Sequence, residues 1–248
     1  MDNIALIKNK ISDYLENKYG EKFIVAQLVS DSGELDVVNK AYVYPEDREA
    51  DWFAVRMNFD DETETVSFRD GYGFIFAEQA ILPSYQALVS KEFPSAKITV
   101  QIKNELEVTR SENSKGLSFE EFIVVENPFA IKINVFLSAD ALADREKFFD
   151  TLTQVIENTP SIACFHDYKI MIVNKDQFTQ FDASQYKGVE LSEYKMRVEE
   201  VITHTNILVP ENEMPEKINE LLKANFCNIS DFSIDSFLAD VVGGAKDD

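Results

Sequence analysis

The sequence predicts an α+β protein in which one or more antiparallel-dominated sheets, with flanking helices, form two lobes or two small domains. Strand-like segments occur in pairs joined by short polar turns, and segments with helical spacing flank these pairs. The chain has 248 residues, of which 45% are hydrophobic, and its 19 Phe provide enough apolar surface for a sizeable core. These observations favour a folded chain over a disordered one.

The opening helix is the clearest predicted element. Its apolar residues recur at helical spacing, at Ile4, Ile7, Ile11 and Leu15. Gly20 follows where the end of a helix favours a residue of positive φ. We expect two hairpins after this helix, formed by residues 22–30 with 35–44 and by residues 52–59 with 65–69.

Residues 70–94 fit either a tight turn at Asp70-Gly71 or a helix. The apolar positions that follow the glycine keep helical spacing, and Asp70 is suited to cap the N-terminus of that helix. We therefore expect a helix that is broken or restarted at Pro83 and ends before Pro94.

The polar segment 109–118 is the best candidate for a linker. We place the boundary near residue 110, with an N-terminal lobe of residues 1–110 and a C-terminal lobe of residues 111–248. Ser118 and Glu121 have the spacing of a capping box at the start of a short helix. The remaining expected elements are strands at 97–102, 130–137, 161–173 and 192–207, and helices at 119–126, 138–158, 215–225 and 234–242.

The charge of the chain restricts its partners. It carries 45 Asp and Glu against 24 Lys and Arg, a net charge of −21. Sequence-general nucleic-acid binding requires clustered Lys and Arg, which we do not find, and an anionic membrane surface is disfavoured for the same reason. We expect no nucleic-acid or membrane partner, and any macromolecular partner should be a protein with a basic surface.

Two cysteines, Cys164 and Cys227, are too few for a disulfide framework, so we expect both to be thiols, with a single bridge as the alternative. Neither a secretion signal nor a run of about 20 apolar residues is recognisable. We expect a cytoplasmic protein, or an extracytoplasmic one if a signal segment has been removed.

Most catalytic and cofactor motifs are missing from the sequence. It lacks the glycine-rich phosphate motifs, the Gly-x-Ser-x-Gly elbow of hydrolases and the His-Glu-x-x-His of zinc proteases. Gly71-Tyr72-Gly73 has no third glycine, so we interpret it as a turn or a helix start. We expect no cofactor.

Cys164 and His166 are the candidate catalytic residues. On a strand they would project to the same face, and an imidazole beside a thiol is what a cysteine nucleophile requires. We favour the alternative, a core cysteine beside a surface or hydrogen-bonded histidine. Zinc binding by this pair with His204 and Cys227 has little support, because zinc ligands usually occur in close sequence pairs. We expect no metal site.

Trp52, the single tryptophan, starts a predicted strand beside Phe53, so alternation should turn one of the two outward. Core packing suits either residue, whereas an exposed aromatic beside carboxylates suits a protein interface. Our candidate partner-binding residues are Trp52 and the carboxylates of the second hairpin turn: Asp60, Asp61, Glu62 and Glu64. The alternatives for these carboxylates are a solvated turn, which we favour, and a calcium site, whose EF-hand spacing is not present.

Four short motifs lie within residues 8–100: ISDYLENKYGEKFIV, Tyr42-Val43-Tyr44-Pro45, Phe53-Ala54-Val55 and Asp70-Gly71-Tyr72. With these motifs the segment resembles the N-terminal part of small uncharacterised α+β proteins and lipoproteins of Gram-positive bacteria. The resemblance implies a bacterial source and a non-enzymatic role, and it supplies no functional residues.

The function that the sequence favours is that of a soluble, non-enzymatic binding or interaction protein. One form of this function is an immunity-type protein that neutralises a basic toxin, because an acidic face accelerates association with a cationic partner. The alternative is an enzyme whose active site we do not recognise, with Cys164 and His166 as its candidate residues. The oligomeric state stays open.

Overall fold

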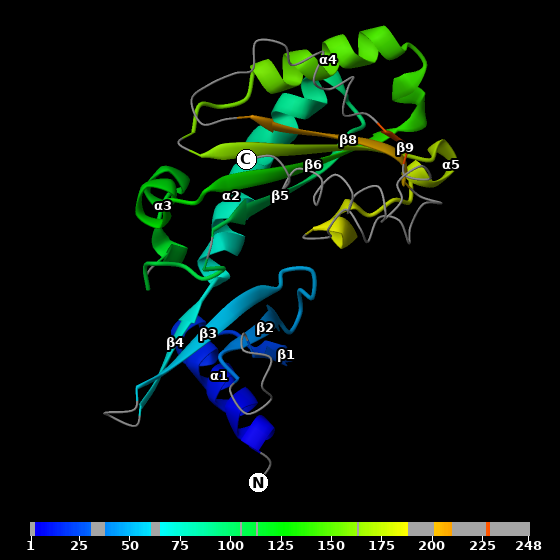
Figure 1. Ribbon diagram of the computed structural model, residues 1–248. Helices are drawn as coiled ribbons and strands as arrows, with labels where there is room; N and C mark the ends of the chain where they lie inside the picture. Colours follow the sequence, from blue (N-terminus) through cyan, green and yellow to red (C-terminus); the bar gives the residue numbers. More distant parts are fainter. Residues whose placement is uncertain are drawn as a thin grey trace, which may run out of the picture. The chain divides into compact units, whose positions relative to one another are not determined.

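The computed structural model describes residues 3–30, 38–60, 65–104, 106–112, 114–162, 164–187, 201–209 and 227–228 (Figure 1). Tertiary contacts divide the chain into unit 1, residues 1–80 and 102–128, and unit 2, residues 81–101 and 129–248. The boundary that we placed near residue 110 lies inside unit 1.

Unit 1 contains a four-stranded antiparallel sheet, counted over the described residues, with the strands in chain order β1-β2-β3-β4. Its elements are α1 (Asn3–Tyr19), β1 (Phe23–Val29), β2 (Lys40–Pro45), β3 (Phe53–Asp60), β4 (Thr65–Asp70), the start of α2 (Tyr72–Glu92), η1 (Ser114–Gly116) and α3 (Phe119–Glu126). Both predicted hairpins are confirmed: β1 pairs with β2, and β3 pairs with β4.

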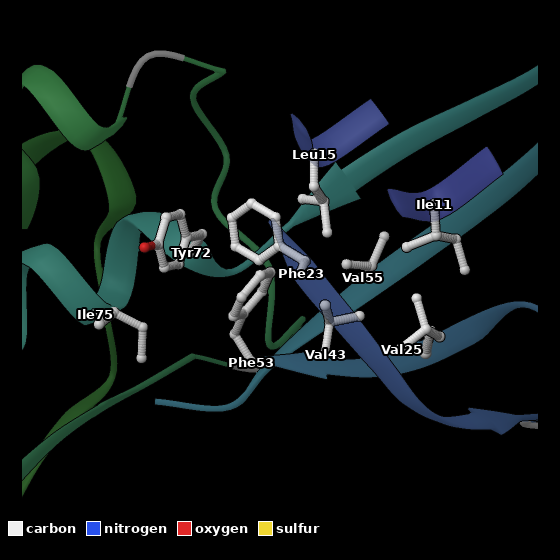
Figure 2. Close-up of a cluster of buried hydrophobic side chains, with 10 residues drawn as sticks. Ile11, Leu15, Phe23, Val25, Val43, Phe53, Val55, Tyr72 and Ile75 are labelled. Carbon is white, nitrogen blue, oxygen red and sulfur yellow. The ribbon is translucent and has the colours of Figure 1, made fainter. Parts of the chain in front are cut away.

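Helix α1 packs on one face of this sheet because its apolar stripe is buried there. Ile11 and Leu15 are fully buried, and Gly20 ends the helix at φ +74° while its N–H donates to the Glu16 carbonyl. Figure 2 shows these two side chains with those of three strands and the start of α2. The buried members of this cluster are Ile11, Leu15, Phe23, Val25, Ala41, Val43, Phe53, Val55, Tyr72 and Ile75.

Helix α2 begins directly after Gly71, and the carboxylate of Asp70 accepts a hydrogen bond from the Tyr72 N–H at 3.0 Å. This agrees with the expected helix start. The expected break at Pro83 is wrong, because α2 continues through the proline to Glu92. Tertiary packing of this buried helix compensates for the hydrogen bond that a proline removes.

The polar segment that we expected to be a linker is fastened to unit 1. The Thr109 N–H and hydroxyl both donate to the Asp70 carbonyl, at 2.8 and 2.9 Å. The carboxylate of Glu126, which is fully buried, accepts from the Ser114 hydroxyl at 2.8 Å and from the Ser111 N–H at 2.9 Å.

The predicted capping box of α3 is present. The Ser118 hydroxyl accepts from the Glu121 N–H at 3.3 Å, and the Glu121 carboxylate accepts from the Ser118 N–H at 2.9 Å. Asn127 ends the helix in the left-handed region, at φ 44°.

Unit 2 is built on a sheet of order β5-β6-β7-β8-β9 in the described part of the chain (Figure 1). Its strands are β5 (Lys97–Lys103), β6 (Ala130–Ser138), β7 (Phe165–Val173), β8 (Val201–Val209) and β9 (Cys227–Asn228). β7 pairs antiparallel with β8, as β8 does with β9, whereas β6 and β7 are parallel. The structure therefore confirms the α+β class with mostly antiparallel sheets.

The parallel pair is connected by η2 (Ala139–Leu142) and α4 (Arg145–Glu157). We expected one helix from Ser138 to Asn158. Instead Ser138 caps the short η2, and Asp144 caps a new helix by accepting from the Lys147 N–H at 3.1 Å. Two capping side chains close together thus divide the segment into two helices.

Both faces of β6 and β7 are covered, which explains why these strands are apolar almost without interruption. Tyr85 of α2 packs against His166 on one face. On the other face, Phe136 and Met171 cluster with residues of α5 (Lys175–Phe178) and η3 (Ala183–Tyr186). Helical segments therefore flank this sheet on both of its faces.

Three further expectations lie outside the described residues, namely the first part of the strand at 192–207 and the helices at 215–225 and 234–242. Within the described residues, no helix has the length and apolar character that crossing a membrane requires.

Candidate functional site

Trp52 lies immediately before β3 and is partly exposed. It keeps 39% of its surface accessible, while its neighbour Phe53 is buried in the core, so the expectation that one of the two turns outward is confirmed. The Trp52 ring stands edge-on to the Tyr42 ring, with centroids 5.5 Å apart and an interplanar angle of 84°. This T-shaped contact holds the indole in place while leaving part of it to solvent.

An acidic turn leads into Trp52. Residues 46–51 contain four carboxylates and one cation, Arg48, which gives the turn a net charge of −3. Arg48 is held by Glu21 at 2.7 Å and lies 3.5 Å from Asp51. Asp47 and Glu49 are exposed at the outer side of the turn. We call Trp52, Tyr42 and residues 46–51 the Trp52 surface.

Tyr42 belongs to the sheet face that α1 does not cover. Its cross-strand neighbour Ala54 lies on this face, and Tyr44 lies two residues along β2. Ile24, opposite Tyr44, is exposed. This part of the face therefore presents aromatic and apolar side chains beside Trp52.

The other part of the same face is closed by residues 106–109. Lys40, Arg56 and Arg69 lie opposite one another on β2, β3 and β4, where three like charges would repel. Lys40 pairs with the Glu107 carboxylate, Arg56 donates to the Leu106 carbonyl at 2.9 Å, and Arg69 donates to the Thr109 carbonyl at 2.9 Å. Within the described residues, one ion pair and two hydrogen bonds to backbone carbonyls thus hold this row of cations, while Trp52 at the other end of the face stays partly exposed.

Of the carboxylates that we grouped with Trp52, the structure describes the position of Asp60, which is not close to it. Asp60 is the last residue of β3, opposite Thr65, whereas Trp52 precedes the first residue of that strand. At about 3.4 Å per residue the two are roughly 27 Å apart along the strand. Asp61, Glu62 and Glu64 lie outside the described residues. The carboxylates beside Trp52 in the chain are those of residues 46–51, which the sequence did not lead us to select.

Cys164 and His166 project to the same buried face, with only 2% and 3% of their surfaces exposed. Burial lowers the pKa of His166 to about 4, and its Nε2 has no hydrogen-bond partner among the described residues. The Tyr85 ring lies 6.0 Å from the imidazole, and the Tyr85 hydroxyl also has no described partner. A cysteine nucleophile must meet its substrate, and so little exposure suits a core position instead.

The four residues considered for zinc fall at two places in the sheet. The register places His204 of β8 opposite Met171 of β7 and opposite Cys227 of β9. His166 lies five residues before Met171, about 17 Å along the strand. Among the described residues, no group of three or more His, Cys, Asp or Glu is placed to hold a metal ion.

A hollow of about 690 Å³ lies in unit 1 between α1 and the segment that includes η1. The aromatic and basic side chains that line it are Tyr14, Tyr19, Phe68, Lys18 and Lys115. We selected none of these residues from the sequence, because the first four look like ordinary helix and strand residues. Only the fold brings Lys115 next to α1.

The described residues thus define an α+β protein with two sheets, a partly exposed Trp52 surface and a lysine- and tyrosine-lined hollow. No protein-family model matches the chain, and no curated protein matches it. It is similar to the crystal structure of a DUF5037 family protein from Ruminococcus gnavus ATCC 29149, with a TM-score of 0.55 and 13% sequence identity. The similarity covers 88% of this chain and 98% of that one. At this identity the likeness shows the fold alone.

Proposed function

We propose that this chain is a binding protein that uses the Trp52 surface to take a basic segment of a partner protein. The observation that carries the proposal is the partly exposed Trp52, standing edge-on to Tyr42 beside a turn of net charge −3. Tryptophan is enriched among the residues that dominate protein interfaces, and it is the aromatic residue that attracts cations best.

Tyr42 of this aromatic pair already makes a cation–π contact within the chain. Lys40 places its ammonium 4.7 Å from the centroid of the Tyr42 ring. An Arg or Lys of a partner would find a comparable contact on the open face of Trp52, with Asp47 and Glu49 close enough in sequence to add charge attraction. Net charge −21 would speed the encounter with such a partner and repel nucleic acid.

Neutralisation of a basic toxin is one form of this function. Such a role requires fast association, which a strongly acidic surface supports. A gene for a secreted basic protein beside the gene for this chain is the observation that would favour it, and neighbouring genes of metabolism would count against it.

The test uses Trp52 as its own reporter, because it is the single tryptophan of the chain. The protein is titrated with an octa-arginine peptide while Trp52 emission is recorded, first at low salt and then at about 0.15 M salt, where the Debye length is about 8 Å. We expect a saturable change in emission, with an affinity that weakens at the higher salt. An octa-glutamate peptide and a short DNA duplex should produce no change.

A matched pair of variants separates the Trp52 surface from the general charge of the chain. Asp47→Asn with Glu49→Gln removes two exposed carboxylates of the turn, and Glu16→Gln with Glu157→Gln removes two exposed carboxylates elsewhere. We expect the first pair to lower the affinity for the octa-arginine peptide at least tenfold. The second pair should change this affinity less than twofold. Equal weakening in both, or no emission change with the wild type, would refute the proposal.

A further inference from the structure

The hollow of unit 1 combines flat aromatic walls with two ammonium groups. Tyr14 of α1 and Phe68 of β4 stack with ring centroids 5.1 Å apart and an interplanar angle of 25°. Tyr19, one turn further along α1, also lines the hollow. These rings offer an apolar surface of the kind that binds the body of a small molecule.

The two ammonium groups of the hollow lie on the same ring. The Lys18 Nζ is 5.1 Å and the Lys115 Nζ is 5.5 Å from the centroid of Tyr19. Lys115 also lies 4.9 Å from the ring of Phe76. Two ammonium groups therefore contact the Tyr19 ring in a chain whose net charge is −21.

Lys18 is held in place by Asp70 and Tyr14. Its Nζ donates to the buried Asp70 carboxylate at 2.7 Å and to the Tyr14 hydroxyl at 3.1 Å. The hydroxyls of Tyr14 and Tyr19 both donate to the same carboxylate, and burial, followed by the charge of Asp70, raises the pKa of each tyrosine well above its usual value. The tyrosines therefore stay neutral, and the charge of Lys18 is balanced by the Asp70 carboxylate and not by a tyrosinate.

The ammonium group of Lys115 is able to donate hydrogen bonds to a ligand. Among the described residues, the carboxylate that pairs with it is that of Glu21, at 3.9 Å, which is too long for a hydrogen bond. Glu21 already accepts from Arg48 at 2.7 Å and from the Tyr72 hydroxyl at 2.8 Å. The side chain of Lys115 is 44% exposed, so a ligand in the hollow can reach its ammonium group.

We propose that this hollow binds a small organic anion, with a flat apolar body against Tyr14 and Phe68 and a carboxylate or phosphate group between Lys18 and Lys115. Glu112 also lines the hollow and disfavours ligands of high negative charge. It would accept a hydrogen bond from an N–H or O–H of the ligand. This site consists of other residues than the Trp52 surface and takes a ligand of the opposite charge.

The test compares four probes by calorimetry: benzoate, phenyl phosphate, benzamide and inorganic phosphate. Benzoate and phenyl phosphate each combine a ring with an anion, so at least one of them should bind, and the tighter of the two identifies the preferred head group. Benzamide lacks the charge and inorganic phosphate lacks the ring, so each should bind at least tenfold more weakly. Binding should shift the amide resonance of Gly116, which lines the hollow.

Lys115→Gln is the decisive variant, because it removes one charge from an exposed side chain and leaves the Lys18–Asp70 pair intact. It should lower the affinity for the ring-bearing anion at least tenfold without changing the melting temperature of the ligand-free protein. The matched control, Lys91→Gln, removes an exposed charge from α2 and should leave the affinity unchanged. Equal binding of benzamide, equal binding of inorganic phosphate, unaltered binding by Lys115→Gln, or no binding of either ring-bearing anion would each overturn the proposal.

Discussion

Asp70 organises the polar part of unit 1, a role larger than the helix cap that the sequence predicted. Its carboxylate is fully buried, and four groups donate to it. They are the hydroxyls of Tyr14 (2.8 Å) and Tyr19 (2.7 Å), the ammonium of Lys18 (2.7 Å) and the N–H of Tyr72 (3.0 Å). A buried carboxylate is tolerated when it is paired and hydrogen-bonded in this way, so Asp70 connects α1 to β4 and the start of α2.

We expect Asp70→Asn to lower the free energy of unfolding by about 3 kcal/mol, because the change leaves the partly buried ammonium of Lys18 without its counter-charge. Urea unfolding followed by Trp52 emission measures this directly, since Trp52 belongs to the same unit. Asp13→Asn, on the exposed side of α1, is the control and should change the free energy by less than about 0.5 kcal/mol. Equal effects of the two variants would contradict the role given to Asp70.

His166 is a residue of unit 2 whose charge state depends on the fold. Burial lowers its pKa from 6.5 to about 4, so the folded protein holds a neutral imidazole at pH 5. The unfolded chain binds a proton there that the folded chain does not. Stability therefore falls as the pH drops from about 6.5 to about 4, and this contribution is constant above that window.

We expect the wild type to lose up to about 3 kcal/mol more than His166→Phe between pH 7 and pH 4, which corresponds to the difference between the two pKa values. Phenylalanine keeps an aromatic ring against Tyr85 and does not titrate. Urea unfolding followed by circular dichroism at several pH values gives the comparison. Parallel curves for the two proteins would show that His166 is not the cause.

At the scale of elements, close backbone approach explains the Gly-Tyr-Gly sequence before α2. A Cβ on Gly71 would lie 2.5 Å from the Glu107 carbonyl oxygen, and a Cβ on Gly73 would lie 2.5 Å from the Cβ of Ser114. The fragment is therefore a helix start, as the sequence suggested, and the glycines let the segment after β5 lie against that start.

We expect Gly71→Ala to destabilise the protein by about 1–3 kcal/mol, because its methyl group would meet a backbone oxygen that moves only with its segment. Gly116→Ala is the matched control, since a Cβ at that glycine meets no atom within 4 Å. It should change the stability by less than about 0.5 kcal/mol. Thermal unfolding of both variants tests the difference, and a harmless Gly71→Ala would mean that the contact is loose.

The elements that the sequence predicted best are those whose signal is local. The stripe of Ile11 and Leu15 identified α1, polar turns identified both hairpins, and Ser118 with Glu121 identified the start of α3. The features that the sequence did not predict depend on contacts between residues far apart in the chain. Pro83 does not break α2, whose packing is tertiary, and the parallel pairing of β6 with β7 depends on a crossover that local patterns do not encode.

At the scale of the whole molecule, charge limits the partners more than it specifies them. A net charge of −21 makes polyanions poor partners and cations good ones. The structure adds that basic side chains are gathered locally. Lys40, Arg56 and Arg69 form a row that residues 106–109 hold, and Lys18 and Lys115 lie at the hollow, where Asp70 pairs with Lys18. Total charge alone contains no sign of either cluster.

The sequence by itself determined the α+β class, the two hairpins, the main helices and the outward turn of one residue at Trp52-Phe53, because hydrophobic periodicity and capping act over a few residues. Only the tertiary structure decided that Trp52 faces solvent beside residues 46–51 and lies about 27 Å along β3 from Asp60. It likewise decided that Cys164 and His166 are buried and that Lys115 reaches Tyr19. Such placements depend on which distant segments pack together, and that choice is made by the burial of the whole core.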